Sequence, residues 1–146
     1  MGEEMVLTLG SQPWQRAASC FVRMNVFVLE KGMQPELEFD AFDLPDTVYA
    51  VISAGYQPIA TGRFIKETDD IARLTRIATL SDYRGQQLGT QIVRGLEEYA
   101  KQLDIKKTLI HAEAEAVPFY EKIGYQLISE VYYEDGVPCQ TLSRDL

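Results

Sequence analysis

The sequence predicts a mixed α/β domain: a central, mostly antiparallel sheet with one parallel strand–helix–strand crossover, and helices on both faces. Two observations predict it. Three consecutive strand-like runs, at 47–54, 58–66 and 71–80, are joined by short polar connections, as antiparallel strands are. An amphipathic helical pattern and a further strand-like run at 107–112 follow them, which is the order of a parallel crossover. At 146 residues, the chain has the length of a single domain, which we expect to span 1–146.

The N-terminal part predicts a strand from Met5 to Leu9, a turn at Gly10 and Ser11, and a helix from about Pro13 to Leu29. Apolar residues at helical spacing predict the side of this helix that packs on the core: Ala17, Cys20, Phe21, Met24, Val28 and Leu29. The acidic segment 31–46 contains two prolines and predicts a loop with at most one helical turn. Loops of this length in small domains often carry function.

The strand-like run 71–80 alternates apolar residues with arginine and threonine on both faces, so we expect it to line a site. The next helix is the clearest in the chain and should end near Asp104. Its predicted core face is formed by Leu88, Ile92, Leu96, Tyr99 and Leu103. The C-terminal part predicts a short helix at 116–123, a strand at 125–133, and a hairpin turn at Asp135-Gly136 onto a strand at 137–142.

Composition excludes several classes of function. A net charge of −8 argues against a nucleic-acid partner and favours a cationic substrate. No apolar run has the length of a membrane span, and the first residues lack a basic and apolar signal pattern, so we expect a cytoplasmic protein and no membrane partner. His111 is the only histidine, and Cys20 and Cys139 lie far apart, so we expect neither a metal site nor a Ser–His triad.

The loop 84–90 connects the strand-like run that ends near Thr79 to the start of the clearest helix. A helix start exposes free backbone N–H groups and the positive end of the helix dipole. Gly85 and Gly89 would let an anion approach the backbone. From these residues alone, an anion site and a plain strand–helix turn both remain open. The loop contains no G-x-G-x-x-G or P-loop pattern, which excludes the common dinucleotide and triphosphate sites.

This loop resembles motif A of the GNAT superfamily of N-acetyltransferases, [QR]-x-x-G-x-[GA], which wraps the pyrophosphate of acetyl-coenzyme A. Arg84 and Gly89 match its outer positions, whereas Gln87 replaces the central glycine. The resemblance implies that Ile77, Ala78 and Thr79 bind the pantetheine arm and that one of their N–H groups polarises the thioester. It also implies a set of residues around the rest of the cofactor: Arg84, Gly85, Gln86, Gln87, Leu88, Gly89, Thr90 and Phe119.

A second segment, 112–125, resembles motif B of the same superfamily, which ends in F-Y, three residues and G-[FY]. Phe119, Tyr120, Gly124 and Tyr125 match this ending. The two motifs occur in the right order at opposite ends of one crossover. The acidic segment PELEFDAFD is also similar to small bacterial GNAT proteins of uncharacterised substrate.

The resemblance implies an acetyl-coenzyme-A-dependent N-acetyltransferase that acts on a small-molecule or peptide amine by direct attack in a ternary complex. Tyr120 holds the position of the family's acid, and its alternative role is that of a core or cofactor-packing ring. The candidate bases are His111, the acidic-loop residues Glu36, Glu38 and Asp40, and water; the same carboxylates are candidates for holding the acceptor ammonium. A non-catalytic acyl-coenzyme A binding module is the alternative function. A homodimer that uses Tyr132 and Tyr133 also remains open.

Overall fold

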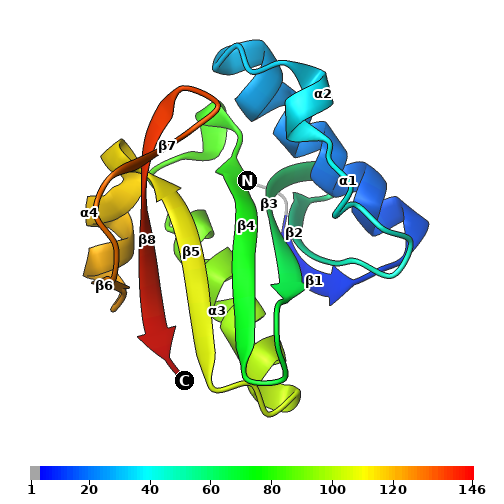
Figure 1. Cartoon of the computed structure of the whole chain (residues 1–146). Coiled ribbons are helices and arrows are strands. Elements are labelled where there is room, and N and C mark those ends of the chain that lie inside the picture. The colour runs from blue at the N-terminus through cyan, green and yellow to red at the C-terminus, as the bar shows by residue number, and fades with distance from the viewer. Residues whose placement is uncertain (1–3) are drawn as a thin grey trace.

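The computed structural model describes residues 4–146 and confirms the predicted fold class (Figure 1). The elements in chain order are β1 (Met5–Gly10), α1 (Pro13–Arg23), the π-helical segment η1 (Met24–Glu30), α2 (Pro35–Glu38), β2 (Val48–Ala54), β3 (Gln57–Lys66), β4 (Ile71–Thr79), the 3-10 turn η2 (Ser81–Tyr83), α3 (Leu88–Gln102), β5 (Lys107–Glu113), the 3-10 turn η3 (Ala114–Ala116), α4 (Val117–Lys122), β6 (Gln126–Leu127), β7 (Tyr132–Glu134) and β8 (Val137–Asp145). No helix within residues 4–146 is long and apolar enough to cross a membrane.

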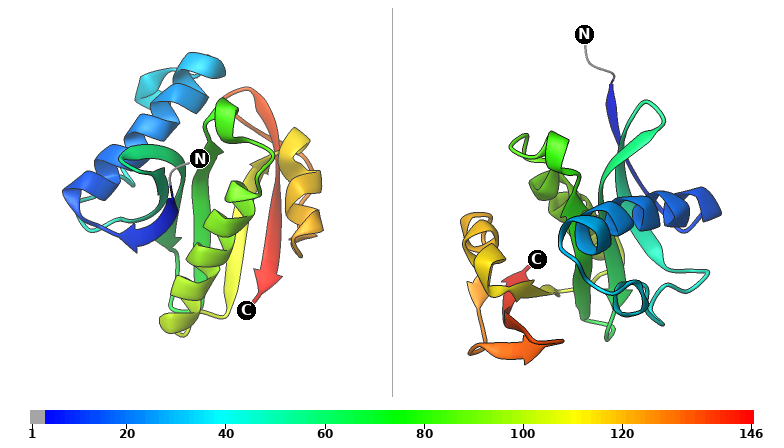
Figure 2. Two further views of the ribbon diagram at one scale, coloured as in Figure 1. Left: turned by 180° about the vertical axis from the view of Figure 1, so that it is seen from behind. Right: turned by 90° about the horizontal axis from the view of Figure 1, so that it is seen from above.

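The strands form one sheet in the order β1-β2-β3-β4-β5-β8-β6, with β7 paired to β8. Every strand pair is antiparallel except β4 and β5, which are joined by α3 and lie parallel. Figure 2 shows α1 and η1 on one face of the sheet and α3 on the other. The sheet is therefore the mixed sheet that the order of elements predicts.

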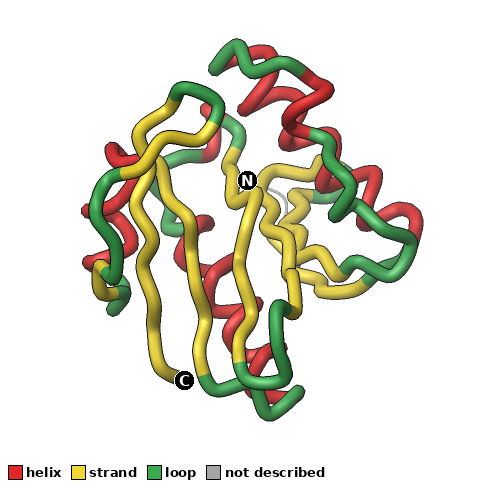
Figure 3. Tube along the Cα trace, viewed as in Figure 1, coloured by secondary structure: helices red, strands yellow, loops and turns green. Residues whose placement is uncertain are grey.

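The parallel pair β4 and β5 is joined over only a short length. Its register runs from Ile71↔Lys107 to Arg73↔Leu109 and ends there, whereas β5 remains paired with β8 as far as Glu113. Figure 3 shows β4 and β5 diverging beyond the paired end. Because no strand pairs with β4 on that side, backbone groups along this part of its edge remain available to a ligand.

A β-bulge interrupts β4 where it borders this opening. Thr61 pairs with Ala78 and Arg63 with Thr75, so β4 has one more residue than β3 between these pairs. The extra length is taken up at Arg76, whose φ of 55° lies in the left-handed region. Opposite the bulge, Gly62 lets α3 approach closely, because a Cβ there would lie 2.6 Å from Cγ2 of Ile92.

Helix α3 covers the main core with the predicted face. Leu88, Ile92 and Leu96 are buried and Tyr99 packs against the same cluster, whereas Leu103 at the C-terminal end is 42% exposed. The N-terminus of α3 is thereby fixed beside the end of β4, where the loop 84–90 joins the two elements.

The prediction for α1 was wrong about its buried face. Of the predicted core residues, Ala17, Phe21 and Leu29 are exposed, and the chain continues beyond Arg23 as a π-helix. The buried residues of α1 and η1 are instead Gln15, Ala18, Ser19, Val22, Arg23 and Val26. The polar residues of this buried face have partners: Gln15 donates to Thr8 and Ser19 accepts from Thr61, whereas Arg23 is paired within a buried ion network.

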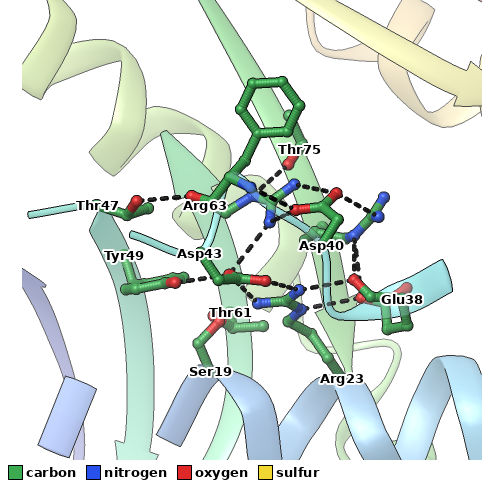
Figure 4. A network of polar contacts seen from close by, with 12 residues as sticks. Ser19, Arg23, Glu38, Asp40, Asp43, Thr47, Tyr49, Thr61, Arg63 and Thr75 are labelled. Atoms are coloured by element: carbon green, nitrogen blue, oxygen red, sulfur yellow. Dashed lines mark hydrogen bonds and ion pairs between the residues drawn. The ribbon is translucent and has the colours of Figure 1, made fainter. Parts of the chain in front are cut away.

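Arg23 is the centre of this network and is fully buried (Figure 4). Its Nε donates to Oε2 of Glu38 at 2.9 Å, and its two Nη atoms donate to the carboxylate of Asp43 at 2.8 and 2.9 Å. Tyr49 donates a further hydrogen bond to Asp43 at 2.6 Å. Burial alone would raise the pKa of Asp43, but the hydrogen bonds from Arg23 and Tyr49 outweigh it and hold the pKa below its usual range.

Two further arginines fasten the acidic segment to the sheet. Arg63 on β3 donates to Oδ1 of Asp40 at 2.8 Å, and Arg76 on β4 donates to Oδ2 of the same residue at 3.0 Å. Arg76 also donates to the backbone oxygens of Glu38 and Leu37. The segment 31–46 does contain the single helical turn α2, and ion pairs hold it against β3 and β4 beside the bulge.

The C-terminal part differs from the prediction in two respects. The expected continuous strand 125–133 is divided into β6 and β7, and β8 is longer than expected, reaching Asp145. The predicted hairpin turn is present, with φ of 49° at Asp135 and 80° at Gly136. This turn holds the end of β7 beside the opening between β4 and β5.

Candidate active site

A cavity of about 170 Å³ occupies the opening between β4 and β5. It is lined by four of the residues that the sequence predicts for the site: Glu38, Ile77, His111 and Tyr120. These residues come from α2, β4, β5 and α4, so the divergence of the two parallel strands brings together distant parts of the chain. The strand with mixed faces, β4, lines the cavity as expected, through Leu74, Thr75, Arg76 and Ile77.

Tyr120 lies within α4 (Val117–Lys122) and is 7% exposed. Within residues 4–146 its hydroxyl makes no hydrogen bond, although its ring packs against Phe119 and Tyr125. Burial, and secondly the charge of Glu113, raise the pKa of Tyr120 above its usual value. The phenol therefore stays protonated over the physiological pH range and can donate its proton to a group in the cavity.

His111 is exposed at the opposite wall of the cavity, with its ring 6.2 Å from that of Tyr132. Its Nδ1 lies 3.3 Å from Nη1 of Arg73. Burial, followed by the charge of Arg73, lowers the pKa of His111, so the imidazole is neutral at pH 7. Because Arg73 can only donate, Nδ1 is the acceptor and the ring hydrogen is assigned to Nε2. In this state His111 offers a hydrogen-bond donor to a ligand.

Glu38 lines the same cavity, but it is 1% exposed and its carboxylate is paired with two arginines. Its Oε2 lies 2.9 Å from Nε of Arg23 and 3.1 Å from Nε of Arg76. Asp40 is bound by Arg63 and Arg76 in the same way, whereas Glu36 is exposed. The acidic segment thus supports the wall of the cavity through its ion pairs.

The loop before α3 presents a run of free backbone donors. Within the described chain, the N–H groups of residues 85–90 have no hydrogen-bond acceptor, and the first such bond at this end of α3 runs from Gln91 to the carbonyl of Gln87. Gly85 and Gln87 both have positive φ, at 82° and 61°. Successive free N–H groups at the start of a helix suit a phosphate group.

Gly89 and Phe119 connect this loop to the cavity. A Cβ on Gly89 would lie 3.3 Å from Cζ of Phe119, so glycine allows the ring to pack directly on the first turn of α3. Phe119 in turn contacts Tyr120, with a centroid separation of 5.0 Å. Phe119 therefore packs between the first turn of α3 and the ring of Tyr120.

The remaining predicted cofactor residues differ in their burial and in the groups that they contact. Ile77 faces the cavity, whereas Ala78 is buried against Val22 and Val26 on the α1 side. The guanidinium of Arg84 is turned away from the free N–H groups, since it binds Glu30 at 2.7 and 2.8 Å and the carbonyl of Thr79 at 3.0 Å. Gln86 and Gln87 are exposed, Leu88 is buried, and Gly89 and Thr90 are half-buried.

Gln87 adopts the left-handed conformation, with φ of 61° and ψ of 25°, at the N-cap of α3. A residue with a side chain destabilises the folded state by roughly 1–2 kcal/mol in this conformation. Glycine would avoid this cost, but it would also make the unfolded chain more flexible, which cancels part of the gain in stability. We expect Gln87→Gly to raise the free energy of unfolding by about 0.5–1 kcal/mol in urea denaturation. Gln86→Gly is the matched control, because Gln86 does not have positive φ. Equal effects of the two substitutions would contradict this account of strain.

Several cavity residues were missed by the sequence prediction: Lys31, Arg76, Glu113, Glu134 and Asp135. Arg76 could have been identified from the sequence, because an arginine within a largely apolar strand needs a partner for its charge. Glu134 and Asp135 carry no such signal, because an acidic hairpin turn is common on any surface. Among residues 4–146, no three side chains gather in a way that would bind a metal ion.

The mixed sheet opens beside the bulge, and free N–H groups lie at the start of α3. A family model described as acetyltransferase (GNAT) domain matches residues 29–146. The chain therefore belongs to the GNAT family of acetyltransferases and is an N-acetyltransferase, which confirms the resemblance seen in the sequence.

Relatives from several bacteria agree with this assignment. An uncharacterized acetyltransferase of Streptococcus pyogenes is 44% identical over 109 residues, which are 75% of each chain. The uncharacterized protein YyaT of Bacillus subtilis is 34% identical over 127 residues, 86% of this chain and 85% of the relative. Among solved structures, a candidate N-acetyltransferase from Lactobacillus plantarum has a TM-score of 0.94 and 34% identity over 99% of both chains. An acyl-CoA N-acyltransferase from Pseudomonas aeruginosa has a TM-score of 0.84 and 25% identity over 97% of this chain and 99% of that chain.

Proposed function

We propose that this enzyme transfers the acetyl group of acetyl-coenzyme A to a primary amine of a small molecule or peptide by direct attack in a ternary complex. The observation that carries the proposal is the position of Tyr120. Its side chain lines the cavity, its hydroxyl has no partner among residues 4–146, and its ring packs on Phe119, which lies against the first turn of α3 beside the free N–H groups of residues 85–90. The acyl-CoA N-acyltransferase among the structural relatives supports an acyl-coenzyme A cosubstrate.

The residues present fit such a cosubstrate in three places. The N–H groups of residues 85–90 would bind its pyrophosphate, and Phe119 would lie beside the pantetheine arm. The edge of β4 beyond Arg73, which no strand pairs, would bind that arm by backbone hydrogen bonds. An N–H group of the bulge would polarise the thioester carbonyl, a contribution of about 3–4 kcal/mol to the barrier in comparable sites.

Tyr120 would return a proton to the departing sulfur. The acceptor ammonium first loses one proton to become the neutral amine. Its nitrogen then forms the bond to the carbonyl carbon and loses a second proton as the bond to sulfur breaks, coenzyme A leaves as the free thiol, and a proton from cavity water replaces the one that Tyr120 donates. The carboxylate of Glu38 is held by arginines, and Nδ1 of His111 accepts from Arg73, so we propose that cavity water takes the amine proton. The exposed residues Lys31 and Asp135 mark where the cavity reaches bulk solvent.

The proposal is tested by thiol release from acetyl-coenzyme A in the presence of pooled polyamines, aminoglycosides, amino acids and lysine peptides. We expect amine-dependent thiol release and a product that carries one acetyl group in mass spectrometry. A thermal shift with coenzyme A but no thiol release with any amine would favour a binding module without turnover. The absence of any thermal shift would count against both functions.

A further inference from the structure

The arginines on the acceptor side of the sheet are neutralised by carboxylates. Each has at least one ion-pair partner within 3.1 Å: Arg23 with Glu38 and Asp43, Arg63 with Asp40 and Asp43, Arg73 with Glu67, and Arg76 with Glu38 and Asp40. The wall formed by these residues therefore has little net charge to offer a ligand.

The β7–β8 turn at the mouth of the cavity has a different electrostatic character. Glu134 and Asp135 are exposed and line the cavity, and neither has an ion-pair partner among residues 4–146. The nearby Glu113 has only Lys31, at 3.6 Å. The two carboxylates of the turn thus leave uncompensated negative charge where an acceptor would enter.

The cavity has a second, independent sign of a ligand. Tyr120 is 7% exposed and lines the cavity, and among residues 4–146 its hydroxyl has no hydrogen-bond partner and is open to a group in the cavity. Tyr120 is a buried residue of the cavity lining, whereas Glu134 and Asp135 are exposed residues of the same lining. An acceptor amine that reacts beside Tyr120 therefore shares the cavity with two exposed carboxylates.

We infer that the acceptor carries a second cationic group besides the amine that is acetylated, and that Glu134 and Asp135 bind this group at the mouth of the cavity. This inference rests on the proposed function. The two-residue turn gives the carboxylates a defined place, because Asp135 and Gly136 both have the positive φ of a tight hairpin. Diamines, polyamines and peptides with a basic side chain beside the reacting amine belong to this class.

The test compares a series of primary diamines of increasing chain length, each paired with the monoamine of the same length, in the thiol-release assay. We expect kcat/KM for the best diamine to exceed that of its monoamine by about tenfold, and added salt to reduce this preference. Glu134→Gln/Asp135→Asn should raise the KM for the diamine about five- to tenfold. The same variant should leave the KM for the monoamine and the KM for acetyl-coenzyme A unchanged.

The control is Asp69→Asn/Glu98→Gln, which removes the same charge from exposed positions outside the lining of the cavity. If this control lowers diamine use as much as the turn variant does, net charge alone is responsible and the inference fails. Equal use of monoamines and diamines also overturns it, while the proposed N-acetyltransferase activity stands. Thiol release with none of the amines would overturn the proposed function itself.

Discussion

Replacing Tyr120 by phenylalanine is expected to lower kcat about a hundredfold and to leave the affinity for coenzyme A nearly unchanged. General acids contribute at least this factor in comparable reactions, and the hydroxyl is the only group that the substitution removes. Because the hydroxyl has no partner in the described chain, its removal should change the free energy of unfolding by less than about 0.5 kcal/mol. Steady-state kinetics, coenzyme A titration and urea unfolding on one preparation measure all three quantities.

Tyr125→Phe is the matched control for this experiment. Its hydroxyl donates to Glu97 at 2.7 Å and lies 2.8 Å from the hydroxyl of Thr108, and it does not line the cavity. We expect this variant to lose about 1–3 kcal/mol of stability and to retain kcat. An unchanged kcat in Tyr120→Phe would remove Tyr120 from the role of acid and leave it the role of a packing ring.

Replacing Arg23 by methionine is expected to destabilise the fold by about 3–5 kcal/mol, because Glu38 and Asp43 would then be left without their buried partner. Methionine has a similar length, so the loss reports mainly on the charge. Since Arg23 holds the acidic segment that forms one wall of the cavity, the KM for the acceptor should rise as well. Urea denaturation gives the change in stability, and initial rates give the KM.

Two variants make the Arg23 prediction specific. Lys66→Met breaks an exposed pair with Asp69 and should change stability by less than about 1 kcal/mol. Adding Glu38→Gln and Asp43→Asn to Arg23→Met should recover part of the loss, because the orphaned charges are removed. A loss of under 1 kcal/mol in Arg23→Met alone would contradict the role assigned to the network.

The sheet was predictable because its signals are local. Alternating runs, the turn at Asp135-Gly136 and the apolar face of α3 each follow from short-range patterns, and the structure has all of them. The length of the strands after Gly124 was less predictable, because pairing with β8 decides where β6 and β7 begin and end.

The face of α1 was not predictable from hydrophobic spacing. Phe21 and Ala17 continue an apolar stripe, but Ser19 and Arg23 on the adjacent side are buried. The partners that make this burial possible lie further along the chain: Glu38 and Asp43 pair with Arg23, and Thr61 donates to Ser19. Helical periodicity carries no information about partners supplied by tertiary structure.

The candidate site was predictable where motifs mark it and unpredictable where the fold brings residues to it. Gly89, Phe119 and Tyr120 were found from motif positions, and in the structure Phe119 packs beside Gly89 and against Tyr120. Glu134 and Asp135 reach the cavity only because β7 and β8 form a hairpin beside the end of β5. Their placement depends on sheet order, which no local pattern specifies.

The central claim is that the opening between β4 and β5, together with the N–H groups of residues 85–90, binds an acyl-coenzyme A. Calorimetric titration with coenzyme A, compared with pantetheine, tests it most directly because pantetheine lacks the pyrophosphate. We predict one coenzyme A site per chain and at least about a hundredfold weaker binding of pantetheine, since charge-assisted hydrogen bonds to the loop are lost. Equal affinity for the two ligands, or no binding of coenzyme A, would contradict the account.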